Sequence, residues 1–318
     1  MTGPQHNKLK ILAAFIAVYF VWGTTYLAIK IAIETIPPLL MMGIRSLVAG
    51  SILYIWGRLR GDANVVRKEL PSLVLIGFLF FLIGHGLIAW AQKSVPSGVT
   101  ALLVASEPIF IALFEPMFTR EGRVGKRTVL GLLIGVCGIA VLVTPQGFDF
   151  KNANLIGSFG ILLGAGAWAS GAIYTRVAQL PRSPLISGGL QLLSGGVLLI
   201  CASFISGEWT DFSFSQVVMR SWLGLAYLIL FGSVIAFSAY TWLLTITSAT
   251  RISTHTFVNP VIAVLVGWAF GGEALTLGML FATLLIIISV YLILFRKKEV
   301  TVKDVVKEAT VVEKVGEP

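Results

Sequence analysis

Charged residues are scarce in this sequence. Asp, Glu, Lys and Arg make up 12% of the 318 residues, while 56% are hydrophobic. A soluble domain has about 25% charged residues, so most of this chain's surface is not built to face water. The composition therefore excludes a soluble domain of useful size. The formal charge of +9 would suit nucleic acid, but the basic residues lie between apolar runs, as in the loops of a membrane protein. The predicted partners are membrane lipids rather than nucleic acid.

Reactive motifs are also lacking. The two cysteines, Cys137 and Cys201, fall inside apolar stretches without metal-ligand spacing. The sequence contains no G-x-x-x-x-G-K-[ST] phosphate loop, no H-E-x-x-H and no G-x-S-x-G. We therefore expect no enzyme activity, catalytic residue, metal or cofactor. Any transport must be driven by a gradient or be passive.

What the chain does have is a series of long apolar runs separated by Pro, Gly and charged residues. A membrane-spanning helix needs about 20 mostly apolar residues. The sequence predicts an all-α integral membrane protein with ten transmembrane helices. The predicted spans are 9–33, 38–57, 71–92, 98–118, 127–144, 155–178, 184–206, 221–244, 251–271 and 275–295.

The distribution of Lys and Arg predicts the orientation. With the N-terminus in the cytoplasm, nineteen basic residues fall in cytoplasmic segments, and the outer segments hold only Lys30, Lys93, Lys151 and Arg220. Cytoplasmic loops of membrane proteins show this excess of positive charge. We expect a multi-pass protein of the cell (plasma) membrane with both termini in the cytoplasm.

The chain shows an internal repeat at offsets of 152 and 146 residues. The matched pairs include Trp22 with Trp168, Trp90 with Trp242, Pro108 with Pro260, and Glu121 with Glu273. Each half then holds five helices, and because five is odd the second half is inverted, a recurring plan of secondary transporters. The alternative is a chance alignment of apolar helices. The predicted organisation is an N-terminal tail 1–8, a repeat 9–144, a linker 145–154, a repeat 155–296 and a C-terminal tail 297–318.

Several motifs resemble the EamA family of the drug/metabolite transporter superfamily, over roughly residues 10–296. They are the first-helix stretch WGTTYLAIK at 22–30, Glu107-Pro108 followed by Glu121, Asn259-Pro260, and GEALT at 272–276. The resemblance implies a ten-helix carrier with a central cavity, usually an exporter of amino acids, metabolites or drugs. The second half departs from the first, with Trp168-Ala169-Ser170 in place of Trp22-Gly23-Thr24 and Asn259 in place of Glu107.

Ionisable residues inside predicted spans are candidate site residues, because a charge near the bilayer centre costs about 2.5–3.5 kcal/mol on insertion scales. Glu107 is a candidate to contact a substrate amine or bind a proton, and Arg45 to bind a substrate carboxylate. His85 lies at a similar predicted depth. The alternative for each is a structural hydrogen bond or ion pair. His255 is interpreted as a packing residue, and Glu115 as a solvated residue at the membrane interface.

Paired aromatic residues and prolines complete the candidate site. Trp22, Trp90 and Trp168 are candidates to line a cavity, with interface anchoring as the alternative. Asn259 joins them as the counterpart of Glu107. Pro108 and Pro260 are predicted to bend the fourth and ninth spans near a midplane site, although tolerated kinks are the alternative.

These observations predict a secondary transporter that works by alternating access and exports amino acids or related small metabolites and drugs. Its expected partners are a small-molecule solute and protons. A facilitator or importer of a sugar or nucleoside is the alternative. A membrane-embedded lipid enzyme and a non-transporting scaffold are less favoured, because we find no reactive cluster, and because duplication and buried charges suit a carrier.

Overall fold

Apolar runs punctuated by proline and glycine form helices throughout the part of the chain that can be described. The computed structural model describes residues 8–95, 100, 103–118, 125–143, 155–210, 212–271 and 277–294, and this part contains helices and turns but no β-strand. The helices of the first half are α1 (Lys8–Ala32), α2 (Pro38–Leu59), α3 (Leu70–Gly77), η2 (Phe78–Gly86), α4 (Leu87–Ala91), α6 (Glu107–Phe118) and α7 (Lys126–Val143). Those of the second half are α8 (Leu155–Val177), α9 (Pro184–Ile205), α10 (Met219–Tyr227), η5 (Leu228–Phe237), α11 (Ser238–Ile246), α12 (Ala249–Ile252), α13 (His255–Gly271) and α14 (Leu277–Leu294).

Six helical stretches in the described residues are long and apolar enough to cross a membrane. They are Lys8–Ala32, Pro38–Leu59, Arg67–Ala91, Leu155–Val177, Pro184–Ile205 and Met219–Ile246. The other four predicted spans overlap with α6, α7, the pair α12 and α13, and α14, each of which has at most 18 residues in a helix. The protein is therefore a multi-pass membrane protein. The predicted linker, most of both tails, and Glu121 and Glu273 of the predicted repeat lie outside the described residues.

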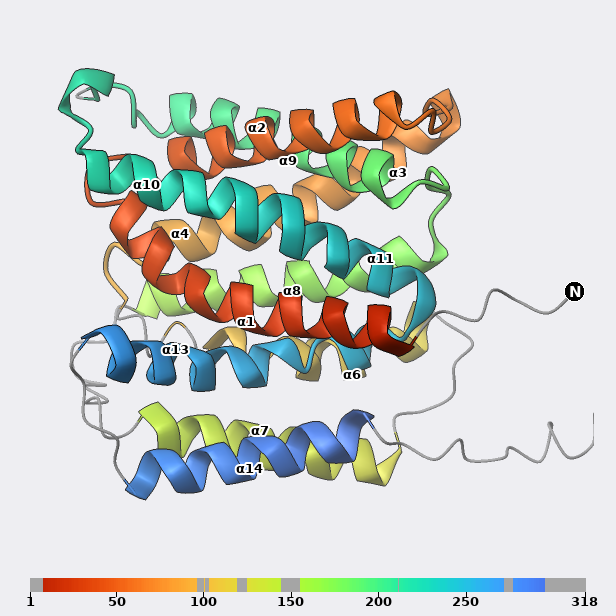
Figure 1. Ribbon diagram of the computed structural model, residues 1–318, viewed down its shortest axis with the longest axis vertical. Coiled ribbons are helices and arrows are strands. Elements are labelled where there is room, and N and C mark those ends of the chain that lie inside the picture. The colour runs from red at the N-terminus through yellow and green to blue at the C-terminus, as the bar shows by residue number, and fades with distance from the viewer. Residues whose placement is uncertain are drawn as a thin grey trace, which may run out of the picture.

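The helices pack in pairs that bring the two halves of the chain together. Figure 1 shows α2 beside α9 at one edge of the molecule and α7 beside α14 at the opposite edge. Between these edges, α1 packs against α13, and α8 packs against α6. Each half therefore contributes one helix to every one of these pairs.

Glycine allows the closest of these approaches, between α2 and α9. A Cβ atom on Gly189 would lie 2.8 Å from the backbone nitrogen of Tyr54 and 3.0 Å from the carbonyl oxygen of Gly50. Small residues let membrane helices approach to backbone contact in this way. The outward faces hold exposed apolar side chains such as Leu9, Ile55 and Leu223, as expected for surfaces that contact lipid.

Two helices contain long stretches of wide π-helical turns at corresponding places in the two halves. The stretches are η2 and η5, and adding the predicted repeat offset of 152 to residues 78–86 gives 230–238, close to the bounds of η5. Backbone hydrogen bonds from i to i+5 are rare and are frequently found at functional sites. Both stretches face the centre of the molecule, where Phe80, Phe81 and Phe237 are fully buried.

Candidate functional site

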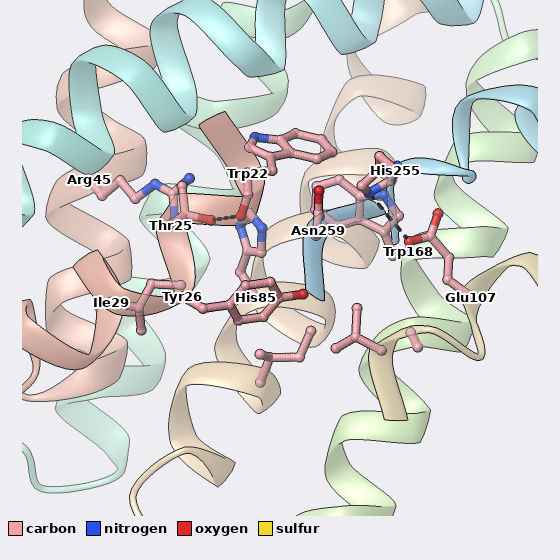
Figure 2. Close-up of a pocket in the computed structure, with 13 residues that line it drawn as sticks. Trp22, Thr25, Tyr26, Ile29, Arg45, His85, Glu107, Trp168, His255 and Asn259 are labelled. Atoms are coloured by element: carbon pink, nitrogen blue, oxygen red, sulfur yellow. Dashed lines mark hydrogen bonds and ion pairs between the residues drawn. The ribbon is translucent and has the colours of Figure 1, made fainter. Parts of the chain in front are cut away.

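The central cavity lies among helices from both halves of the chain (Figure 2). It offers about 70 Å³ in which the centre of a water molecule can lie, whereas one water needs roughly 10–15 Å³ by this measure. The space therefore suits several waters or a small solute. Six predicted site residues line it: Trp22, Arg45, His85, Glu107, Trp168 and Asn259.

Glu107 brings a buried carboxyl group to this cavity. It is the first residue of α6 and is only 3% exposed. Its Oε2 lies 3.9 Å from Nε2 of His255, which is longer than a hydrogen bond. Its Oε1 has no hydrogen-bond partner among the described residues. A buried polar atom without a partner is costly, so this oxygen is available to a ligand or a water.

His255 faces Glu107 with a defined tautomer. Its Nδ1 lies 2.9 Å from the carbonyl oxygen of Ile252, and because a carbonyl only accepts, Nδ1 must carry the hydrogen. In the neutral ring Nε2 is then an acceptor directed at Glu107. The interpretation of His255 as a packing residue is incomplete, because it also lines the cavity. No local signal in the sequence distinguished the two roles.

Arg45 provides a buried cation from α2. It is 3% exposed, its Nε donates to Oγ of Ser233 at 2.8 Å, and its Nη1 lies 3.7 Å from Sδ of Met42. None of the ion pairs among the described residues involves Arg45. Buried charges in proteins are usually paired, so an arginine without a described carboxylate partner marks a place for an anionic group.

Trp22 and Trp168, which the predicted repeat pairs, meet at the cavity wall. Their ring centroids lie 5.7 Å apart, edge to face. Nε1 of Trp22 donates to the carbonyl oxygen of Gly232 at 3.0 Å, and Nε1 of Trp168 donates to Oη of Tyr240 at 2.9 Å. Both indole N–H groups are therefore bonded to the protein, so the rings present mainly apolar surface to the cavity.

The two histidines of the cavity pack on these rings. His255 lies 4.8 Å from Trp22 and His85 lies 4.8 Å from Trp168, measured between ring centroids. Asn259, with its amide nitrogen turned toward them, is within hydrogen-bonding distance of the carbonyl oxygens of His255 (2.9 Å) and Tyr19 (3.1 Å). The structure places Trp90 elsewhere, because it is 39% exposed and does not line the cavity.

The two matched prolines occupy different places in their helices. Pro260 lies inside α13, as expected. Pro108 instead lies in the first turn of α6. This helix begins at Glu107, directly after a turn at Ala105 and Ser106. A first-turn proline leaves no helical hydrogen bond unmade, since the N–H it lacks would have no partner within the helix. The break therefore precedes Glu107 and does not depend on a kink at Pro108.

Glu115 differs from expectation. It is 7% exposed and not solvated at the interface. Its Oε1 forms an ion pair with Nη1 of Arg176 at 3.0 Å, and its Oε2 accepts from Oγ1 of Thr250 at 2.6 Å. These partners lie 61 and 135 residues away, so sequence proximity could not reveal them. The cluster joins α6 of the first half to α8 and α12 of the second.

Comparisons with known proteins agree with this architecture. Residues 9–144 and 155–295 each match the model of the EamA-like transporter family. The chain is 36% identical over 292 residues to the uncharacterized inner membrane transporter YedA of Escherichia coli (strain K12), covering 89% of this chain and 92% of YedA. It is 28% identical over 297 residues to the uncharacterized transporter YvbV of Bacillus subtilis (strain 168), covering 92% of this chain and 93% of YvbV. A protein crystal structure with 20% sequence identity superposes with a TM-score of 0.75, covering 90% of this chain and 96% of that one, which shows a shared fold.

Proposed function

The chain belongs to the EamA-like transporter family, and from this membership we propose that it is a secondary transporter that moves a small solute by alternating access. The observation that carries the proposal is the central cavity, in which two ionisable side chains, Arg45 and Glu107, are buried without an ion pair between them. Intramembrane ionisable residues that face a cavity are typical of solute and proton pathways.

Two observations support an arrangement of ten transmembrane helices as inverted repeats. The family model matches the chain twice, over ranges close to the proposed repeats 9–144 and 155–296. The helix pairs also exchange under the repeat, since α1 with α13 becomes α8 with α6, while α2 with α9 and α7 with α14 are unchanged. An axis in the membrane plane that relates inverted halves would produce this pattern.

Alternating access requires contacts between the halves that break and form in turn. The cluster of Glu115, Arg176 and Thr250 supplies such a contact at the end of the bundle predicted to face the cytoplasm. We propose that it closes that end of the cavity and that both termini lie on the same side, in the plasma membrane.

The proposed cargo is an amino acid or a related small metabolite, moved out of the cell. The resemblance to exporters motivates the direction, and the small cavity supports the size. Glu107 would bind a proton or a cationic group of the solute. Arg45 would bind an anionic group.

Efflux from proteoliposomes tests this function. Vesicles are loaded with a mixed pool of labelled amino acids and metabolites, with and without a pH gradient, for wild type and Glu107→Gln. We expect gradient-sensitive loss of particular solutes that the variant abolishes. Glu34→Gln is the matched control, because the Glu34 side chain is 41% exposed and does not line the cavity.

Other outcomes discriminate between the alternatives. Efflux that responds to neither the gradient nor Glu107→Gln would indicate a facilitator for another solute and remove Glu107 from the mechanism. If no solute moves, the transporter proposal is wrong, and the enzyme and scaffold alternatives return.

A further inference from the structure

We infer, building on the proposed transport function, that the cavity selects ω-amino acids, in which a carboxylate and an ammonium group stand at opposite ends of a chain, over α-amino acids. The inference rests on the positions of two buried charges and on what lies between them.

The anionic end of such a solute fits Arg45. Ser233 holds the guanidinium through Nε, and Met42 Sδ is the one other contact within hydrogen-bonding distance that the described residues make to it. A guanidinium has five N–H donors, so most of them remain for a carboxylate, whose two oxygens match its planar fork.

The cationic end fits Glu107. Oε1 has no hydrogen-bond partner in the described part of the chain, and Oε2 is 3.9 Å from His255. An ammonium group carries three donors, enough to reach both carboxylate oxygens and the acceptor nitrogen of His255. Trp22, whose ring meets His255 in an edge-type contact, also lines the cavity, and an indole ring attracts cations.

The rings of Trp22 and His255 lie one after the other between the anionic and the cationic end of the site. At one end, Arg45 donates to Ser233. The preceding residue, Gly232, accepts from Trp22 through its carbonyl oxygen. The Trp22 ring contacts His255, and His255 faces Glu107. Figure 2 accordingly shows Arg45 and Glu107 at opposite ends of the cavity. In an α-amino acid the nitrogen and the carboxyl carbon are separated by one carbon and lie roughly 2.5 Å apart, so one molecule cannot reach both charges.

The ionisable and apolar side chains that line the cavity favour a solute with a single amine and an apolar chain. Among the lining residues, Arg45 supplies the one guanidinium and Glu107 the one carboxyl group. An ω-amino acid pairs with them one to one, whereas a dibasic amino acid brings a second ammonium for which no lining carboxylate exists. Ile29 and Ile88 also line the cavity and suit a chain of methylene groups.

A pair of isomers tests the inference. Proteoliposomes containing the full chain are loaded with labelled 5-aminopentanoate or labelled 2-aminopentanoate, which differ only in the position of the amine. We expect at least tenfold faster exchange of 5-aminopentanoate, and a melting temperature of the purified protein that rises with this isomer only. Arg45→Gln and Glu107→Gln should each abolish the preference.

Controls keep folding and recognition apart. Arg45→Lys keeps the charge and should retain a reduced preference, and Glu107→Gln should exchange 5-hydroxypentanoate, whose neutral end suits an amide. Each variant is first shown to elute as the wild type does in size-exclusion chromatography.

The remaining outcomes separate this inference from the function on which it rests. Equal exchange of the isomers, or faster exchange of 2-aminopentanoate, overturns the inference and leaves a working carrier. Exchange of other solutes without either isomer overturns it in the same way. If no solute at all exchanges, the transporter proposal fails, and the inference fails with it.

Discussion

Gly232 lies between Trp22 and Arg45. Its carbonyl oxygen accepts from Trp22, and the next residue, Ser233, accepts from Arg45. A Cβ at Gly232 would lie 3.0 Å from Nη2 of Arg45 and 3.2 Å from Cγ2 of Thr25. Contacts this short force the guanidinium or the threonine to move by a few tenths of an ångström. We expect Gly232→Ala to slow transport several-fold, measured as efflux, because the guanidinium shifts relative to the solute.

Gly166→Ala is the matched control for that change. Its added Cβ would come no closer than 3.8 Å to any neighbour, on the ring of Phe110, so transport and melting temperature should match wild type. Unchanged efflux in Gly232→Ala would contradict the assigned position of Arg45 in the site.

In the proposed site, His255 and Glu107 act together on the cationic end of the solute. Asparagine at position 255 keeps a side-chain donor for the carbonyl of Ile252 but removes the ring nitrogen that faces the carboxyl group. We expect His255→Asn to reduce efflux, and the double variant with Glu107→Gln to exchange 5-hydroxypentanoate no more slowly than Glu107→Gln alone, because residues that act as a unit are not additive. Additive losses would show that the histidine serves packing alone.

At the scale of elements, α2 and α9 are in backbone contact. Gly189→Ala places a Cβ 2.8 Å from the backbone nitrogen of Tyr54, which cannot move aside without shifting the helix. Overpacking of this kind costs about 1–3 kcal/mol. The melting temperature of the detergent-solubilised protein should fall.

The neighbouring residue gives the control for the helix contact. Gly188→Ala adds the same methyl group, but its nearest contact would be 3.5 Å, to Oγ1 of Thr241. We expect its melting temperature to stay near that of wild type. If the melting temperature falls equally in both variants, the effect comes from adding a methyl group to α9 and not from the close approach of α2.

Element boundaries were predicted well where proline marks them. The predicted spans 38–57 and 184–206 correspond to α2 and α9, which begin at Pro38 and Pro184. The sequence did not reveal that the third and eighth spans change to π-helical turns at Phe78 and Leu228. Apolar residues alone do not distinguish i+4 from i+5 hydrogen bonding, since packing against other helices decides between them. The sequence also did not predict the turn before Glu107. Pro108 indicated an interruption of the helix, but not that the helix would begin only at Glu107.

At the scale of the whole molecule, the ion pair of Glu115 with Arg176 should control which side of the cavity opens. A hydrogen bond to a charged group contributes about 1.5–3 kcal/mol, which corresponds to a change of about 10- to 100-fold in a two-state equilibrium. We expect Glu115→Gln to shift the protein toward the state open at that end.

Labelling measures this shift. A cysteine at Ala165, which lines the cavity, is introduced after Cys137 and Cys201 are replaced by serine. An impermeant thiol reagent applied from the side of Glu115 should react faster in Glu115→Gln. The control is Glu34→Gln, which breaks a 3.9 Å pair with Arg220 at the surface, where such pairs contribute little. Faster labelling from the opposite side alone would contradict the proposed closure.

The site was predicted only in part. A sequence indicates how deep a residue lies in the membrane, but not which way its side chain faces. Arg45, His85 and Glu107 were expected at one depth, and the structure brings all three to one cavity. Counting along each helix could not show that Trp90 faces away, or that His255 of the other half faces Glu107. Those facts depend on how helices from the two halves rotate against each other, which one sequence does not record.

The paired π-helical stretches have a consequence for how this chain can change over generations. A π-helical turn holds about one more residue than an α-helical turn, so the loss of one residue from η2 or η5 can be absorbed by closing a wide turn into an α-helical one. The same loss from a regular α-helix would turn everything beyond it by about 100°. The residues within the closing turn would shift, and among them are His85, which lines the cavity, and Ser233, which accepts from Arg45. A single-codon deletion in either stretch would therefore disturb the site locally while leaving a helix long enough to span the bilayer.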